Sequence, residues 1–204
     1  MLCTITTDAV VDSEVLQRVL EAATKVTFDR IDSDGCMSTN DTVLLLASGA
    51  SGTAPGEDEL LEAVTEVCRT LARALIADAE GASKDICITI VSASSESDAL
   101  EVARAVSRSN LLKCAIHGED PNWGRVISAA GTTRAMFEPD EIGVAINGIW
   151  VCRNGSVGED RNLVDMSSRD VMIEVDLHAG DTSVTVWTND LTAAYVHENS
   201  AYSS

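Results

Sequence analysis

The sequence is poor in aromatic residues, in proline and in positive charge. Aromatic residues make up 3% of the 204 residues and proline occurs three times, so a core must be built mainly from aliphatic side chains, which the hydrophobic content of 45% allows. Lysine and arginine number 14 against 33 acidic residues, which gives a formal net charge of −19. Such a charge repels phosphate backbones and anionic lipid headgroups. Nucleic-acid-binding and membrane-surface proteins are therefore disfavoured.

Long apolar runs are also missing. No stretch approaches the roughly 18 apolar residues that a membrane-spanning helix needs. The opening residues, MLCTITTDAVVDSE, hold neither the basic segment nor the apolar segment of a secretory signal. These absences predict a cytoplasmic protein.

Paired cysteines and the common catalytic motifs are absent as well. The six cysteines lie about thirty residues apart and form no C-x-x-C motif, so Cys68 and Cys87 are interpreted as reduced thiols in apolar segments. Nucleophile elbows, phosphate-binding loops and the H-E-x-x-H zinc motif do not occur. The acidic segment 29–41 lacks the glutamate that closes a calcium loop, so no metal site is expected. Cys114 and His117 are better explained as a helix-end thiol and a surface imidazole than as a catalytic pair.

Apolar periodicity predicts four helices. Gly81 follows the longest of them as its left-handed cap. The acidic Glu80 would then lie at a negative helix end, a local conflict that mildly indicates function. The helices are expected over 14–30, with Ser13 as N-cap, over 57–79, over 97–113, and from about Pro121 onward.

Aliphatic and β-branched runs predict strands between the helices and near the end of the chain. The run 42–48 is continuous enough for a strand buried on both faces. The segments 171–177 and 183–189 are joined by a short loop, which predicts an antiparallel hairpin. This order of elements favours an α/β or α+β fold with a mixed or antiparallel sheet. Further strands are expected over 85–92, 142–147 and 149–152, the last two forming a bent strand or tight hairpin at Gly148.

Two segments have unusual compositions. The loop 118–125, GEDPNWGR, surrounds a tryptophan with turn-forming residues and is compatible with an anion site at a helix start or with a structural turn. The last ten residues hold both tyrosines of the chain. Because tyrosines usually pack, we expect this end of the chain to be ordered.

Four segments run the length of the chain in order: 1–9 (MLCTITTDA), 38–42 (STNDT), 118–125 (GEDPNWGR) and 198–204 (ENSAYSS). Together they resemble signatures of the ornithine acetyltransferases, the bifunctional glutamate N-acetyltransferases of arginine biosynthesis. The resemblance implies an α/β fold with a mixed, largely antiparallel sheet packed with helices, similar to the self-processing DmpA-like enzymes. It also implies that residues 1–204 are the single β-chain unit of a self-cleaved precursor, completed by an α chain in an α2β2 heterotetramer.

The chemistry that the resemblance implies is a ping-pong transfer. A threonine freed at the start of the β chain takes acetyl from N-acetylornithine, releases ornithine and passes the acetyl group to glutamate. Its own α-amine can act as the base, so no histidine is needed. No cofactor is expected, and acetyl-CoA is a further candidate acetyl donor.

The resemblance also implies site residues. Glu80, in the segment Asp78-Ala-Glu-Gly81, is similar to a substrate-binding carboxylate of the family, and Asn199 and Ser204 match substrate-contacting positions. The nucleophilic threonine would immediately precede Met1, so the 204 residues themselves supply no catalytic residue. Two alternatives remain: a self-processing amidohydrolase or aminopeptidase of the same class, and a non-catalytic acidic α/β binding module.

Overall fold

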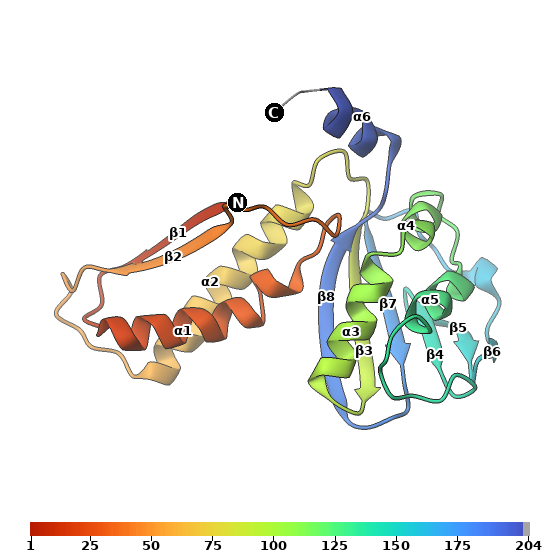
Figure 1. Cartoon of the computed structure of the whole chain (residues 1–204), viewed down its shortest axis with the longest axis horizontal. Helices are drawn as coiled ribbons and strands as arrows, with labels where there is room; N and C mark the ends of the chain where they lie inside the picture. The colour runs from red at the N-terminus through yellow and green to blue at the C-terminus, as the bar shows by residue number, and fades with distance from the viewer. Residues whose placement is uncertain (202–204) are drawn as a thin grey trace. The chain divides into compact units, whose positions relative to one another are not determined.

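The computed structural model describes residues 1–201, which fold into two compact units (Figure 1). Unit 1 comprises Met1–Ile31 and Cys36–Leu75. Unit 2 comprises Asp32–Gly35 and the chain from Ile76 onward. The prediction that residues 1–204 are one β-chain unit concerns how a precursor is cut, which this division does not test.

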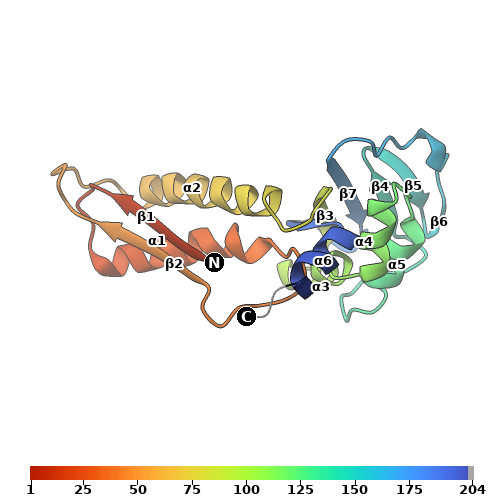
Figure 2. The same cartoon turned by 90° about the horizontal axis from the view of Figure 1, so that it is seen from above.

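Unit 1 is a parallel pair of strands next to two helices, as Figures 1 and 2 both show. Parallel strands cannot be joined by a tight turn, and the first helix lies in the connection between them. Its core is the cluster around Ile5, Val19 and Cys68. Burial raises the pKa of the Cys68 thiol, as expected of a core cysteine. The elements are β1 (Leu2–Thr7), α1 (Ser13–Lys25), the short 3-10 helix η1 (Phe28–Arg30), β2 (Thr42–Ala47) and α2 (Glu57–Ala77).

The strand pair of unit 1 has one covered face and one open face. Side chains such as Val43 and Leu45 point toward the core cluster, whereas Leu2, Leu44 and Leu46 are 78%, 42% and 52% exposed. The prediction that segment 42–48 is buried on both faces is therefore wrong within this chain. A run of consecutive apolar residues gives a strand two apolar faces, and here only one of them has a covering layer.

The first helix is shorter than the segment 14–30 over which apolar periodicity predicts it. It ends at Lys25, because Thr27 turns its hydroxyl back to donate to the Ala23 carbonyl at 2.7 Å and its backbone leaves the helical region. The helix begins at Ser13, so Asp12 and not Ser13 is its N-cap, without a side-chain capping bond.

Unit 2 is built on a six-stranded sheet of order β6-β5-β4-β7-β3-β8, in which β3–β7 is the parallel pair and the other neighbours are antiparallel. The predicted mixed, largely antiparallel sheet is confirmed. The strands are β3 (Asp85–Ala93), β4 (Gly143–Ile146), β5 (Ile149–Arg153), β6 (Ser156–Val157), β7 (Asp170–Asp176) and β8 (Thr182–Asn189); the helices are α3 (Glu96–Ser107), α4 (Asn110–His117), α5 (Trp123–Ala130), the 3-10 helix η2 (Arg161–Leu163) and α6 (Ala193–Ala201).

The core of unit 2 lies between one face of the sheet and helices α3, α4 and α5 (Figure 1). Alternate residues of the central strand β3, Ile86, Ile88 and Ile90, are at most 1% exposed and belong to this core. Val102 of α3 and Ile116 of α4 pack into the same cluster. The aliphatic core expected from the low aromatic content is confirmed.

The predicted hairpin of segments 171–177 and 183–189 is wrong, although both strands exist. Strand β3 lies between them, parallel to β7 and antiparallel to β8. The connecting loop passes around the end of β3, where Leu177 N–H donates to the Val91 carbonyl at 3.1 Å and Ala179 N–H donates to the Ser92 carbonyl at 2.7 Å. A short loop can thus join two strands that are next-nearest neighbours.

The predicted helix 97–113 is two helices, α3 and α4. The chain breaks at Ser109, whose hydroxyl accepts from Leu112 N–H at 3.3 Å and caps α4. Other predictions hold: Asn147 and Gly148 both take positive φ in the tight turn between β4 and β5, and α5 begins close to Pro121. The expected order at the end of the chain holds for α6 up to Ala201, and Tyr202, the second of the two tyrosines, lies outside the described residues.

Among residues 1–201, no helix combines the length and the apolar character required to span a membrane.

Candidate functional site

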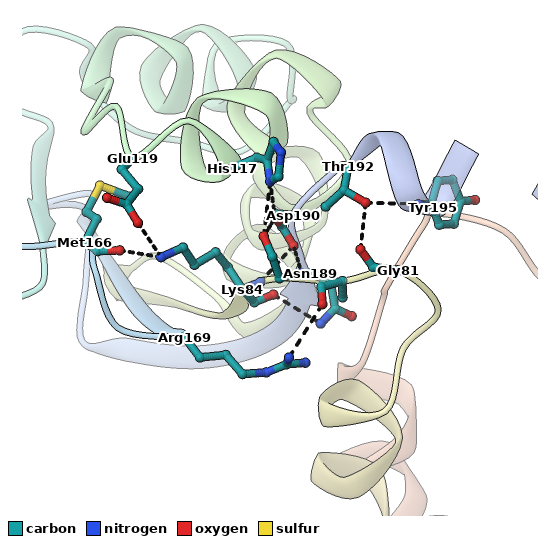
Figure 3. A network of polar contacts seen from close by, with 12 residues as sticks. Gly81, Lys84, His117, Glu119, Met166, Arg169, Asn189, Asp190, Thr192 and Tyr195 are labelled. Atoms are coloured by element: carbon teal, nitrogen blue, oxygen red, sulfur yellow. Dashed lines mark hydrogen bonds and ion pairs between the residues drawn. The ribbon is translucent and has the colours of Figure 1, made fainter. Parts of the chain in front are cut away.

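The candidate site is organised around Asp190, directly after strand β8. Its side chain is fully buried and accepts from the N–H groups of Ser83 and Lys84, both at 2.9 Å. The Ser83 hydroxyl and His117 Nδ1, the latter at 2.9 Å, bind the second carboxylate oxygen (Figure 3). One carboxylate therefore joins the end of β8, the loop that follows α2, and the end of α4.

The charged form of Asp190 is favoured despite its burial. Burial alone would raise the pKa of the Asp190 carboxyl, but the hydrogen bonds from Ser83, Lys84 and His117 outweigh it, so the pKa lies below its ordinary value. The loop that binds this carboxylate is consequently held by a negative charge at neutral pH.

Two neighbouring side chains fix the same loop. The Asn189 amide donates to the Ile76 and Lys84 carbonyls at 2.9 and 3.2 Å. The Lys84 ammonium, buried at 6% exposure, donates to Glu119 Oε1 at 2.9 Å and to the Met166 carbonyl (Figure 3). It also donates to the Ser168 carbonyl at 2.9 Å. Because these groups are buried and paired, the loop from Glu80 to Lys84 has a defined conformation.

The structure brings together two of the three predicted substrate-binding residues. Asn199 Nδ2 of α6 donates to Glu80 Oε2 at 3.4 Å, although the residues are 119 positions apart. Ser204 lies outside the described residues. Glu80 lies beyond the helix end, because α2 stops at Ala77, so the predicted conflict with the helix dipole does not arise. Gly81 has the predicted positive φ, 66°, but it belongs to the loop after the helix and does not cap it.

A cavity of about 250 Å³ lies beside these residues within unit 2. Its walls carry both signs of charge, and Tyr195 Oη donates to Asp34 Oδ2 across it at 3.0 Å. Such a polar cavity suits a small zwitterionic or charged metabolite. The lining residues are Ser33, Asp34, Glu80, Ala82, Arg108, Asn110, Lys113, Asn189, Asp190, Leu191 and Tyr195.

Lys113 is the most buried cation of this cavity. Its ammonium donates to the Ser33 carbonyl and to Thr188 Oγ1, the latter at 3.1 Å. Burial lowers its pKa, and the nearby carboxylates of Asp32, Asp34 and Asp190 oppose that shift only in part. It supplies a positive group to a cavity that is also lined by the acidic residues Glu80 and Asp34.

Other candidate features of the sequence have structural explanations. In residues 1–201 no group of three or more His, Cys, Asp or Glu side chains is arranged to hold a metal ion. In the loop 118–125, the Asn122 side chain caps α5 by accepting from Arg125 N–H at 3.3 Å, and Trp123 packs against the core. His117 bonds to Asp190 and not to a cysteine.

Sequence reasoning missed Asp190, Thr192 and Asp34. A usable signal was present in the run Asn189-Asp-Leu-Thr192, because Asn, Asp and Thr directly after a strand often bind the backbone of another segment. Asp190 binds Lys84 and Thr192 binds Gly81, both more than 100 positions earlier in the chain, so the sequence alone does not identify these partners.

Comparison with known proteins gives relatives along the whole chain. The Arginine biosynthesis bifunctional protein ArgJ of Streptomyces avermitilis is 67% identical over 204 residues, and that of Thermobifida fusca is 63% identical. Both alignments cover 100% of this chain and 53% of the relative, so the chain spans about half the length of these curated relatives.

A solved structure agrees with the fold. The crystal structure of the arginine biosynthesis bifunctional protein ArgJ from Bacillus halodurans matches with a TM-score of 0.92 at 34% identity, covering 99% of this chain and 100% of that chain. The ArgJ family matches residues 1–204. This chain belongs to the ArgJ family.

Proposed function

We propose that this chain is the β chain of an acetyltransferase that moves acetyl from N-acetylornithine to glutamate in arginine biosynthesis. The observation that carries the proposal is the meeting of Glu80 and Asn199 at 3.4 Å beside a polar cavity, in a chain 67% identical to a protein named for bifunctional arginine biosynthesis. The resemblance to the ornithine acetyltransferases implies that both residues bind substrate.

The proposed reaction has two half-reactions. The hydroxyl of a threonine immediately before Met1 in the longer protein attacks the acetyl carbonyl of N-acetylornithine, with the threonine α-amine taking the proton. The C–N bond breaks, ornithine leaves with that proton, and an acetyl ester remains on the threonine. The amine of glutamate then attacks the ester, which yields N-acetylglutamate and restores the hydroxyl. Donors on an α chain would stabilise the oxyanion of each tetrahedral intermediate.

The residues of this chain act in binding. The Glu80 carboxylate is exposed and suits the ammonium group of ornithine or of a glutamate substrate. The Asn199 amide, which already contacts Glu80, can orient that carboxylate and reach polar groups of the substrate. Ser204 completes this group in the proposal.

A second chain is part of the proposal. The open face of β1 and β2 exposes Leu2, Leu44 and Leu46, and a two-stranded sheet is only marginally stable without further covering. An α chain from the same precursor would cover this face, in an α2β2 assembly in the cytoplasm. The relatives are about twice as long as this chain, which supports such a precursor.

The test is an acetyl-transfer assay on the protein expressed from its whole reading frame. N-acetylornithine and glutamate together should yield ornithine and N-acetylglutamate in equal amounts. Release of ornithine and free acetate without N-acetylglutamate would instead assign a hydrolase, and no consumption of N-acetylornithine would leave a binding module. Acetyl-CoA in place of N-acetylornithine tests the second acetyl donor, with CoA thiol as the product to measure.

A further inference from the structure

We propose that Thr192 is a positioning residue that sets the spacing between Glu80 and Asn199. This inference rests on the proposed function, because it concerns the binding of the amino-acid substrate. It assigns a role to a side chain that does not itself face the cavity. The Thr192 hydroxyl makes two hydrogen bonds, one to Gly81 and one to Tyr195 (Figure 3).

The Thr192 hydroxyl joins helix α6 to the loop that carries Glu80. It donates to the Gly81 carbonyl at 2.6 Å and accepts from Tyr195 N–H at 2.9 Å. The second bond makes Thr192 the N-cap of α6, which begins at Ala193. Thr192 is 5% exposed, so water does not readily replace either partner. A single buried group thus fixes both the start of the helix and its distance from the loop.

The loop and the helix meet backbone against backbone. A Cβ atom at Gly81 would lie 2.4 Å from Tyr195 N and 2.7 Å from the carbonyl carbon of Ala194, and φ at Gly81 is +66°. Only glycine fits such a position. Close contact at this point leaves little freedom in where the first turn of α6 lies relative to residue 81.

Both sides of this contact between the loop and α6 are adjacent to the predicted substrate-binding residues. Glu80 directly precedes Gly81, and Asn199 lies one turn beyond Tyr195 on the same face of α6. Asn199 Nδ2 donates to the Tyr195 carbonyl at 3.0 Å and to Glu80 Oε2 at 3.4 Å. Fixing Tyr195 against Gly81 therefore fixes Asn199 against Glu80.

Apolar packing contributes little to holding the helix. None of the described residues of α6 is buried, in contrast to α3, α4 and α5, whose apolar faces enter the core. Its position depends on polar contacts, namely those of Thr192, the bond from Tyr195 Oη to Asp34 at 3.0 Å and the longer bond from Asn199 to Glu80 at 3.4 Å. Removing the hydroxyl should therefore displace Asn199 without unfolding the sheet.

The experiment compares Thr192→Val, which keeps the shape but removes the hydroxyl, with Thr192→Ser, which keeps the hydroxyl. In the complete protein, Thr192→Val should raise KM for N-acetylornithine about tenfold, the effect of losing one hydrogen bond between the substrate and a displaced Asn199. Its kcat should stay within about twofold, and Thr192→Ser should match the wild type, since binding and not chemistry is affected. An unchanged KM in Thr192→Val, a fall in kcat alone, or equal defects in both variants would overturn the inference.

A double-mutant cycle tests the route through Asn199. If Thr192 acts by placing Asn199, adding Thr192→Val to Asn199→Ala should change KM much less than tenfold. If the two residues act independently, the increases in KM of the two single variants should multiply. Multiplied effects would contradict the positioning role. The wild type in the same assay separates the two claims. If the wild type transfers no acetyl, the proposed function is contradicted and this inference with it. If the wild type transfers acetyl and Thr192→Val is fully active, only the inference is contradicted.

Discussion

At the scale of single residues, the molecule depends on a few buried polar groups that connect distant segments. The Asp190 carboxylate is the clearest, because four donors from Ser83, Lys84 and His117 surround it. Its depressed pKa is the thermodynamic counterpart of those bonds. A group whose pKa is lower in the folded state stabilises that state above its unfolded pKa, and the stabilisation disappears as the pH falls through the folded value.

Asp190→Asn should therefore lower the free energy of unfolding by about 2–3 kcal/mol at pH 7, since buried donors lose a charged acceptor. The difference from the wild type should begin to shrink below about pH 4, the ordinary range of an aspartate pKa, because the unfolded state takes up a proton there, whereas the folded carboxylate with its lower pKa is protonated only as the pH falls further. Urea denaturation at a series of pH values measures both. A difference that is the same at pH 3 and pH 7 would rule out the charge as its source.

Gly81→Ala should be among the more destabilising substitutions of a loop residue. It forces a side chain into left-handed backbone, which costs about 1–2 kcal/mol, and against the backbone of Tyr195. The matched control is Gly56→Ala, where a Cβ meets nothing within 4 Å and φ is not in the left-handed region, so stability should change by less than about 0.5 kcal/mol. Equal melting temperatures for the two variants would contradict this assignment.

Residue-scale prediction from the sequence had a clear limit. The resemblance identified Glu80 and Asn199, which the structure then brought together. Asp190 and Thr192 were not identified, because an isolated Asp or Thr after a strand is common and its meaning depends on partners 107 and 111 positions away. A polar run directly after a strand therefore indicates a tertiary contact without identifying its partner.

At the scale of helices and strands, apolar periodicity predicted which elements exist better than how they pair. The strands 171–177 and 183–189 form as expected, but β3 inserts between them. Pairing was misjudged because loop length favours adjacent strands, whereas burial of Ile86, Ile88 and Ile90 favours a central place for β3. A helix break at Ser109 was missed for a similar reason, since the apolar face continues across it.

The central place of β3 gives a stability prediction. Ile88→Ala should lower the free energy of unfolding by about 2–5 kcal/mol, because Ile88 is 0% exposed and lies between two paired strands. Met172→Ala, on the exposed side of β7 at 61%, should change it by less than about 0.5 kcal/mol. Chemical denaturation of both variants checks this, and a cost below 1 kcal/mol for Ile88→Ala would contradict a β3 at the centre of the core.

At the scale of the whole molecule, the chain has two compact units, each with its own apolar cluster. The larger cluster is closed on one side by three helices, whereas the strand pair of unit 1 keeps an apolar face open. Composition alone predicted enough aliphatic residues for a core, but it did not show that some of them remain exposed. That open face is where the proposal places the α chain.

Leu44→Asp should weaken association with the α chain while leaving the folding of this chain nearly unchanged, because Leu44 is 42% exposed. Met136→Asp, at a residue 71% exposed in unit 2, serves as the control and should leave association intact. Size-exclusion chromatography of the co-expressed chains gives the result. Normal assembly of the Leu44→Asp protein would place the α chain elsewhere.

The central claim is that acetyl passes through a covalent ester on a threonine that precedes Met1. The most direct test is the intact mass, under denaturing conditions, of the protein expressed from its whole reading frame and mixed with N-acetylornithine in the absence of glutamate. The account predicts two chains, one of which gains a single acetyl group on a peptide that begins with threonine and continues as Met1-Leu-Cys-Thr4. Subsequent glutamate should remove that acetyl group. A single uncleaved chain, or chains whose masses never change with N-acetylornithine, would contradict the account.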